Sequence, residues 1–216
     1  MIYIYTGAVG SGKSYHALRE GLRKISSIPD RFVVANFPIK FSKNKKKAEK
    51  EMRRWVYLDN SEITPENLIR IAFEKCFFGK EGHCLLIIDE AGIFFNSRDW
   101  FVNPKQRAEW IKFFSQSRKF GYDVILVTQD LRMIDRQIRS MADFEIKHLS
   151  MKKYKWLSWL PFKTFAYVTY WMNTRFKGNV EFDILLPWVA NRYDTMRLFN
   201  VPDDIKKLAS EKGYNI

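Results

Sequence analysis

The sequence predicts an α/β fold in which a mainly parallel sheet is flanked by helices. Short, apolar, β-rich runs alternate with segments of helical periodicity over residues 1–145. One of these runs, Cys84 to Asp89, is apolar until its final carboxylate, as a central strand of a parallel sheet would be. The chain has 216 residues, 46% of them hydrophobic, and this length is enough to bury a sizeable core without disulfides.

The expected elements follow in strand–helix order. The run from Ile2 to Tyr5 is a short strand, and a glycine-rich turn leads from it into a helix with Leu18, Leu22 and Ile25 on one face. Thr64-Pro65-Glu66 is typical of a helix start. The expected strands cover residues 2–5, 31–37, 55–58, 84–89 and 124–127, and the expected helices cover residues 14–25, 64–78, 104–120 and a segment, capped by Asp130 or Asp135, that ends at Met141.

The periodicity changes after residue 143. From Phe144 to about Leu186 the apolar residues alternate, which indicates an antiparallel β extension, and Asp203 to Ser210 has the pattern of a helix. We therefore expect a core over residues 1–145 and, over residues 146–216, a β extension of the same domain with a helical tail. Ligands of such parallel sheets bind at the carboxyl ends of the strands.

Composition favours an anionic partner. The chain has 37 Lys and Arg against 24 Asp and Glu, a net charge of +13, which suits a nucleotide, a nucleic acid or a membrane surface. The run from Lys40 to Arg54 holds eight basic and two acidic residues. A solvated loop is one interpretation of this run; the others are contacts with phosphate backbones, with Phe41 and Trp55 stacking on bases, or with anionic headgroups.

Several classes of protein are excluded. Cys76 and Cys84 are too few for a disulfide framework and do not have the spacing of a zinc site, so two buried, reduced thiols are expected. The chain opens without the basic segment and apolar run of a secretory signal. It contains no run of 18 apolar residues, and we expect none of it to span a membrane.

The strongest motif is a phosphate-binding loop. Gly7-Ala-Val-Gly-Ser-Gly12-Lys13-Ser14 matches G-x-x-x-x-G-K-[ST] in full, between an expected strand and an expected helix. Its glycines let backbone N–H groups point at a β-phosphate, Lys13 supplies charge for the β and γ oxygens, and the Ser14 hydroxyl suits Mg²⁺. The guanine-reading tetrapeptide N-K-x-D is absent, so ATP with Mg²⁺ is the expected cofactor. The expected nucleotide-binding residues are Gly7, Ala8, Val9, Gly10, Ser11, Gly12, Lys13, Ser14 and Tyr15.

An acidic pair is the expected partner of this loop. Asp89 ends an apolar run, where it would hold Mg²⁺ together with Ser14, and Glu90 would deprotonate an attacking water. Gln129, after the strand at residues 124–127, would emerge at the same edge and bridge the water and the γ-phosphate. The alternatives are a solvated Asp-Glu turn and, for Gln129, a helix-capping turn.

Several arginines are candidates for an arginine finger that completes a neighbouring subunit's site. Of Arg118, Arg132, Arg136 and Arg139, we favour Arg139 or Arg118, and the alternative for each is a solvated helix residue. The expected catalytic set is Glu90, Lys13, Gln129 and Arg139, and the expected metal ligands are Ser14 and Asp89.

The sequence resembles the zonula occludens toxin (Zot) family, which includes the inner-membrane assembly ATPases of filamentous phages. The resemblance rests on the blocks GAVGSGKS, LLIIDEAGIFFNSRDW and WIKFFSQSRKFGYDVILVTQDLRMIDRQIR, of which Ser115 to Arg139 is the most specific part, and on Tyr193-Asp194-Thr195. It implies a P-loop NTPase fold of the additional-strand, catalytic-glutamate type, related to the FtsK/HerA pumping ATPases. It also implies the assigned roles of Lys13, Ser14, Asp89, Glu90 and Gln129, and a cytoplasmic domain at the host inner membrane, anchored by a segment outside these residues.

The leading functional hypothesis is an ATP-hydrolysing motor for the assembly and export of filamentous phage. Its expected partners are copies of itself in a homo-oligomeric ring, phage coat and exit-channel proteins, and a single-stranded DNA cargo. One alternative is a DNA-translocating or packaging ATPase that acts directly on nucleic acid. A second is a nucleotide-gated, non-enzymatic scaffold or secreted effector, although an effector fits poorly with the missing signal peptide. A small-molecule kinase would have no need of Glu90.

Overall fold

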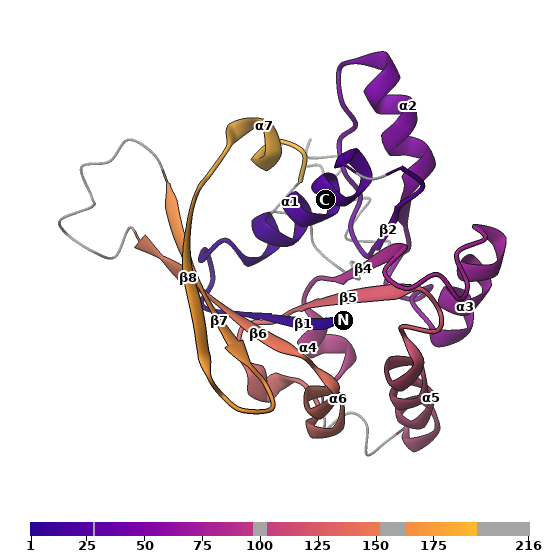
Figure 1. The fold of residues 1–216 in the computed structure, drawn as a ribbon, viewed down its shortest axis with the longest axis vertical. Coiled ribbons are helices and arrows are strands. Elements are labelled where there is room, and N and C mark those ends of the chain that lie inside the picture. The colour runs from indigo at the N-terminus through magenta and orange to yellow at the C-terminus, as the bar shows by residue number, and fades with distance from the viewer. Residues whose placement is uncertain (28, 97–102, 152–162, 194–216) are drawn as a thin grey trace, which may run out of the picture.

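The computed structural model of the chain describes residues 1–27, 29–96, 103–151 and 163–193, which form one eight-stranded sheet with helices on both faces (Figure 1). The strands are β1 (Ile2–Thr6), β2 (Phe32–Ala35), β3 (Trp55–Tyr57), β4 (Cys84–Ile88), β5 (Tyr122–Val127), β6 (Phe144–Ser150), β7 (Thr164–Trp171) and β8 (Lys177–Ile184). The helices are α1 (Lys13–Ser27), α2 (Lys45–Arg54), α3 (Pro65–Glu74), α4 (Ala91–Phe94), α5 (Pro104–Gln116), α6 (Arg136–Met141) and α7 (Pro187–Ala190), with a 3₁₀ turn over Leu131–Met133.

The strand order is β3-β2-β4-β5-β1-β6-β7-β8. The six strands from β3 to β6 run parallel, and β7 and β8 complete the sheet as an antiparallel hairpin. Strand β5 lies between β1 and β4, so it is the additional strand that the family resemblance implied. The expected fold class is therefore confirmed. One detail was wrong: the antiparallel extension begins at β7, since β6 pairs parallel to β1, Tyr3 opposite Phe144.

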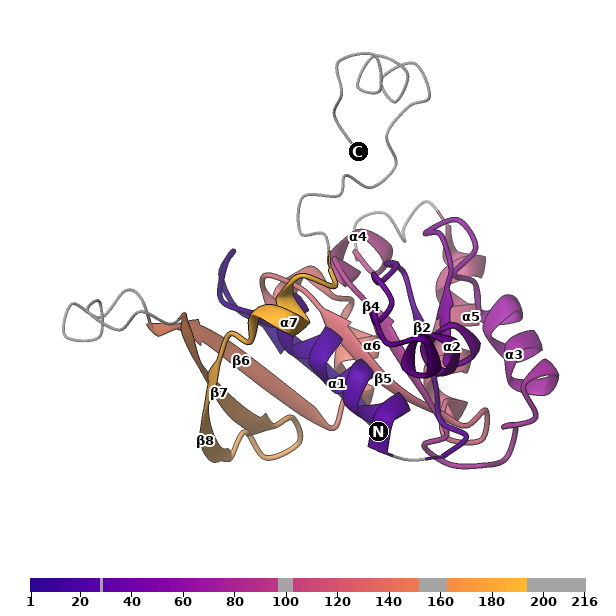
Figure 2. The same ribbon diagram turned by 90° about the horizontal axis from the view of Figure 1, so that it is seen from above.

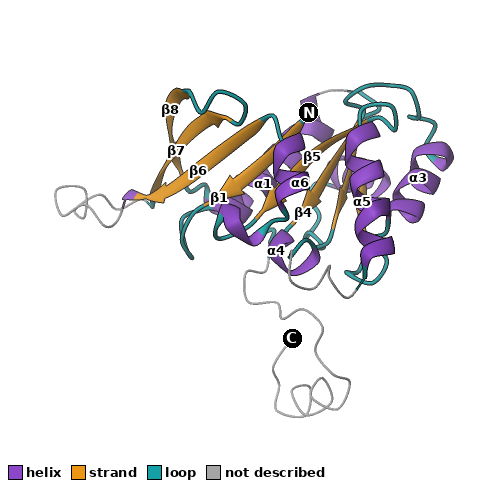
Figure 3. Ribbon diagram, turned by 90° about the horizontal axis from the view of Figure 1, so that it is seen from below, coloured by secondary structure: helices purple, strands orange, loops and turns teal. Residues whose placement is uncertain are grey.

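Each face of the sheet carries its own hydrophobic core. Helices α1 and α7 cover one face, as Figure 2 shows, and α3, α4, α5 and α6 cover the other, as Figure 3 shows. The alternation within β4 divides its residues between the two cores: Leu85 and Ile87 pack on the α1 side, and Leu86 and Ile88 on the other. All five residues of β4 are buried, as its uninterrupted apolar sequence predicts.

Local sequence explains most of the helix boundaries. The Thr64 hydroxyl accepts a hydrogen bond from the Asn67 N–H at 3.2 Å, and Pro65 occupies the first turn of α3. Helix α5 ends at Gln116, four residues earlier than expected, and a turn closes at Gly121 with φ +84°. A side chain at Gly121 would meet the Phe77 carbonyl oxygen at 2.5 Å, so the turn requires glycine.

The basic run forms a helix where a solvated loop was one interpretation. Asn44 caps α2 by accepting a hydrogen bond from the Lys47 N–H at 3.2 Å. The buried residue of α2 is Glu51, which is 2% exposed. Its carboxylate accepts a hydrogen bond from the Ser42 N–H and pairs with Arg192 from the far end of the described chain.

Three smaller expectations have mixed outcomes. Cys84 is buried, but Cys76 is exposed beyond α3, so the expectation of two buried thiols was wrong for Cys76. In the described part of the chain, none of the helices is long and apolar enough to cross a membrane. The expected helix at Asp203 to Ser210 lies outside the described residues.

Candidate nucleotide-binding and catalytic site

The phosphate loop connects β1 to α1 and is enclosed by the strands beside it. Gly7 has φ +141°, and a side chain there would meet the His148 carbonyl oxygen at 2.4 Å. Gly12 has φ +93°, and a side chain there would meet the Phe165 ring at 2.7 Å. Both positions therefore require glycine for conformation and for space, so the loop keeps the tight curl that aims its N–H groups inward.

Lys13 begins α1, and its side chain folds back over the loop. Its ammonium donates hydrogen bonds to the carbonyl oxygens of Gly7 at 2.9 Å and Ala8 at 3.0 Å, and the residue is 8% exposed. Burial lowers the pKa of Lys13, while the charges of Glu90 and Asp89 oppose that shift. Among the described residues, the Ser11 hydroxyl is the one buried side-chain group without a hydrogen-bond partner. The loop therefore combines a concentrated positive charge with an unused donor, which fits a phosphate chain.

Asp89 is held at the end of β4 by the neighbouring strand. Asn36, directly after β2, accepts a hydrogen bond from the Asp89 N–H at 2.8 Å and donates one to the Asp89 carbonyl oxygen at 2.9 Å. The Asp89 carboxylate is buried and accepts hydrogen bonds from the Glu90 N–H at 3.0 Å and the Tyr193 hydroxyl at 2.8 Å. Sequence reasoning did not single out Asn36, although a polar residue after an apolar strand was the signal used for Gln129.

Glu90 has the conformation and electrostatics of a functional residue. Its backbone is left-handed, with φ +51° and ψ +42°, a region that non-glycine residues enter at a cost. Partial burial, and then the charge of Asp89, raise the pKa of Glu90, while Lys13 lowers it. A carboxylate with a raised pKa is a better proton acceptor, so this side chain suits a general base.

Gln129 lies just beyond β5, which is between β1, the strand that leads into the phosphate loop, and β4, the strand that ends before Asp89. Its carbonyl oxygen accepts a hydrogen bond from the Gly7 N–H at 3.2 Å, and the residue is exposed. The fold thus brings Gln129 to the same edge of the sheet as the phosphate loop and the acidic pair.

The side chains of two predicted site residues, Tyr15 and Arg139, do not face the phosphate loop. The Tyr15 hydroxyl contacts the backbone of Ile184 and Leu186, so its side chain points into the α1 core. Arg139 lines a pocket with Met172 and Arg175 and lies near the start of β6, at the edge of the sheet opposite the phosphate loop. The structure does not bring Arg139 to the nucleotide site of its own chain.

Arg118, the other favoured arginine, also lies far from the loop. It precedes β5 and forms ion pairs with Glu81 at 3.4 Å and Asp143 at 4.0 Å, again at the amino ends of the parallel strands. Either arginine is thus a candidate only for a neighbouring subunit's site.

The donor set of the site fits Mg²⁺. Ser14 and Asp89 offer a hydroxyl and a carboxylate, hard oxygen donors of the kind that Mg²⁺ uses together with waters and phosphate oxygens. Within the described ranges, no group of three or more His, Cys, Asp or Glu residues is arranged to hold a metal ion.

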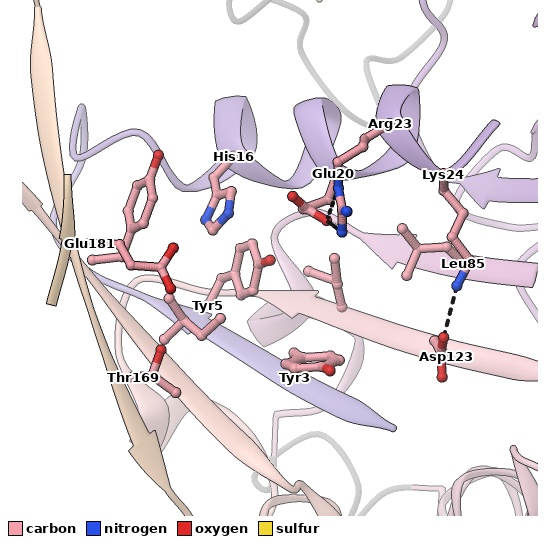
Figure 4. Close-up of a pocket in the computed structure, with 13 residues that line it drawn as sticks. Tyr3, Tyr5, His16, Glu20, Arg23, Lys24, Leu85, Asp123, Thr169 and Glu181 are labelled. Atoms are coloured by element: carbon pink, nitrogen blue, oxygen red, sulfur yellow. Dashed lines mark hydrogen bonds and ion pairs between the residues drawn. The ribbon is translucent and has the colours of Figure 1, made fainter. Parts of the chain in front are cut away.

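A cavity of about 240 Å³ lies between α1 and the face of the sheet that α1 covers, and residues of β1 and β4 to β8 line it (Figure 4). Tyr3, Tyr5 and His16 line it, and ion pairs between Arg23 and Glu20 and between Lys24 and Asp123 border it.

His148, which is buried, and His16, which is partly buried and lines this cavity, join β6 to α1. His148 Nδ1 lies 2.9 Å from the Ile146 carbonyl oxygen, so Nδ1 is its donor, and His148 Nε2 accepts from His16 Nδ1 at 2.9 Å. Burial, followed by the charges of Arg19 and Arg23, lowers the pKa of His16 to about 4. Burial and then the charge of His16 lower the pKa of His148 to about 3.

We expect this pair to make the fold sensitive to acid. Below pH 6.5 the unfolded chain binds protons that the native His16 and His148 reject, so the free energy of unfolding falls as pH falls towards 4. The loss is roughly 3 kcal/mol for His16 alone. Urea unfolding from pH 8 to pH 4 measures it, and His16→Phe should flatten the slope. His83→Gln is the matched control, since His83 lies outside the pair; an equal flattening by that variant would contradict the assignment.

Taken together, the inserted strand β5, the phosphate loop and the Asp89–Glu90 pair at one sheet edge define a P-loop NTPase domain. The family model of the zonular occludens toxin (Zot) matches residues 1–157. The chain belongs to this family, as its sequence motifs implied.

Relatives in sequence agree with this assignment. The Gene 1 protein of Enterobacteria phage I2-2 is 29% identical over 138 residues, 64% of this chain and 37% of the relative. The Gene 1 protein of Escherichia phage If1 is 30% identical over 138 residues, which is 64% of this chain and 38% of the relative. The chain thus spans less than two fifths of their length.

The solved structures with a similar fold include the following two. The genome-packaging NTPase B204 of Sulfolobus turreted icosahedral virus 2, in complex with ATP-γS, has a TM-score of 0.56 at 17% identity, covering 83% of this chain and 96% of that one. The N-terminal domain of zonular occludens toxin from Neisseria meningitidis has a TM-score of 0.50 at 18% identity, covering 89% and 98%.

Proposed function

We propose that the chain is the ATP-hydrolysing domain of a motor for filamentous phage assembly and export. The observation that carries the proposal is the meeting of Lys13, the Asp89–Glu90 pair and Gln129 at one edge of the sheet. Membership of the Zot family and the likeness to phage Gene 1 proteins support the phage context.

Each residue has a defined task in this proposal. The loop N–H groups and Lys13 bind the β- and γ-phosphates of ATP, and Ser14 and Asp89 hold Mg²⁺, which neutralises charge on the phosphates. Gln129 orients a water, and Glu90 accepts its proton as the water attacks the γ-phosphorus. The loop that carries Lys13 and Ser14 and the strand ends that precede Asp89 and Gln129 lie at one edge of the sheet.

The first proposed partner is a second copy of the chain, because of where Arg139 lies. Arg139 is remote from its own chain's loop, so it would act on a neighbouring subunit in a homo-oligomeric ring. The family resemblance adds phage coat and exit-channel proteins, a single-stranded DNA cargo, and the host inner membrane, reached through a segment beyond these residues.

Oligomers assembled from two different variants test both ATP hydrolysis and the action of Arg139 on a neighbouring subunit. We expect ATP turnover per chain to rise with protein concentration, and Arg139→Ala to lower it by roughly 10³-fold. Mixing Arg139→Ala chains with Glu90→Gln chains should restore partial turnover, because some sites regain one intact Glu90 and one intact Arg139. Phosphate release measures this, with Arg136→Ala on the same helix as the control. A mixture as inactive as its components would exclude Arg139.

A DNA-translocating ATPase is the second candidate, favoured by the exposed Lys45, Lys46 and Lys47 on α2. Stimulation of ATP turnover by single-stranded DNA would favour this function. The stimulation should disappear when these three lysines are replaced by glutamine. The matched control removes three other exposed lysines, Lys75, Lys80 and Lys119. A chain that binds ATP and never hydrolyses it would instead be the nucleotide-gated scaffold.

A further inference from the structure

The last described part of the chain returns to the nucleotide site. We name residues 184–193, which contain α7, the C-terminal strap. At its start, the Tyr15 hydroxyl donates a hydrogen bond to the Ile184 carbonyl oxygen at 3.1 Å and accepts one from the Leu186 N–H at 3.0 Å. Tyr15 directly follows Ser14, so the strap begins against the helix that carries the phosphate loop.

The other end of the strap is fixed by a buried ion pair. The Arg192 guanidinium lies 2.6 Å from the Glu51 carboxylate, and their side chains are 11% and 2% exposed. The Arg192 carbonyl oxygen accepts a hydrogen bond from the Lys40 N–H at 2.9 Å, and Val189 is fully buried in the α1 core. Because burial leaves this pair little freedom, the position of the next residue is well determined.

That next residue is Tyr193. Its hydroxyl donates a hydrogen bond to Asp89 Oδ2 at 2.8 Å, and its ring packs edge-on against Phe37 with 4.7 Å between centroids. The other carboxylate oxygen, Oδ1, accepts from the Glu90 N–H at 3.0 Å. Each oxygen of Asp89 thus has its own donor, and together the two donors set the plane of the carboxylate.

We infer that Tyr193 is a positioning residue for the metal-binding carboxylate of the ATPase site. An aspartate that binds Mg²⁺ works best when its unused lone pairs are already turned towards the metal, and a donor outside the coordination sphere achieves this. Tyr193 supplies that donor from the strap. The inference rests on the proposed function, since it gives Asp89 the role of metal ligand.

The Mg²⁺ dependence of nucleotide binding tests the inference without relying on turnover. The variant Tyr193→Phe keeps the ring against Phe37 and removes the hydroxyl. Its affinity for a fluorescent ATP analogue in EDTA should equal that of the wild type. The Mg²⁺ concentration that half-saturates the increase in affinity should rise about 10-fold, as is typical when such a second donor is lost. Mn²⁺ titration followed by electron paramagnetic resonance, with ADP bound, should show the same change.

The control is Tyr57→Phe, because the Tyr57 hydroxyl also donates to an aspartate, Asp59 at 3.3 Å, which is not a proposed metal ligand. That variant should leave the Mg²⁺ dependence unchanged. A Tyr193→Phe midpoint equal to the wild type overturns the inference, and a lower midpoint overturns it too, since the hydroxyl would then compete with the metal for Oδ2. A wild-type chain that binds nucleotide equally well with and without Mg²⁺ overturns the proposed function and the inference with it.

Discussion

Replacing Lys13 with alanine is expected to weaken ATP binding on the order of 100-fold, or about 2.7 kcal/mol. The Lys13 ammonium places a full positive charge inside the loop, where it donates hydrogen bonds to the carbonyl oxygens of Gly7 and Ala8. The oxygens of bound phosphates would replace those carbonyls as hydrogen-bond partners of the ammonium. Their negative charge would stabilise the protonated form of Lys13, which burial disfavours. No other lysine of α1 reaches the loop, because Lys24 pairs with Asp123 at the other end of the helix.

Equilibrium binding of a fluorescent ATP analogue measures this effect. Arg23→Ala is the matched control: it removes a cation from the same helix, but Arg23 pairs with Glu20 and does not touch the loop. The variant chain should remain folded, since the freed carbonyl oxygens can be hydrated at the loop. Equal affinities for wild type and Lys13→Ala would show that the loop is not the ATP site.

The phosphate loop was predictable because its determinants are local. Eight consecutive residues specify the curl, the charge and the hydroxyl, and the flanking apolar strand and amphipathic helix fix its place in the sheet. Asp89 was predictable for a similar reason, since a carboxylate that ends a fully apolar strand emerges at the same edge. The parallel core follows from the strand–helix alternation.

The remaining features depend on contacts between distant residues. Tyr193 lies 104 residues from Asp89, and nothing local to either residue indicates their hydrogen bond. The direction of β6 was mispredicted because alternation reports which side chains are buried and carries no information on pairing direction. The helix in the basic run was not predicted, because a run of like charges is also typical of a solvated loop. The contacts that hold this helix are the Asn44 cap and the ion pair of Glu51 with the distant Arg192.

Replacing Glu90 with glutamine is expected to reduce ATP hydrolysis by roughly 10² to 10⁴-fold while leaving ATP affinity within about 3-fold of the wild type. Glutamine matches glutamate in size and retains its hydrogen-bonding oxygen, but it cannot accept the proton of an attacking water. The left-handed backbone at φ +51° should be retained, because glutamine and glutamate have the same backbone preferences and size, so the variant isolates the charge. Single-turnover phosphate release measures hydrolysis, and analogue binding measures affinity.

The matched control for this prediction is Glu145→Gln. Glu145 accepts a hydrogen bond from the Thr6 hydroxyl at 2.6 Å, directly before the phosphate loop, so it is a carboxylate near the site without access to the γ-phosphate. Its glutamine variant should hydrolyse ATP at close to the wild-type rate. The raised pKa of Glu90 adds a second signature: as pH falls through that pKa, the wild-type rate should fall because the base becomes protonated, whereas the residual rate of Glu90→Gln should stay level. Wild-type turnover by Glu90→Gln would move the general base elsewhere and leave Asp89 as the acidic residue that the nucleotide site requires.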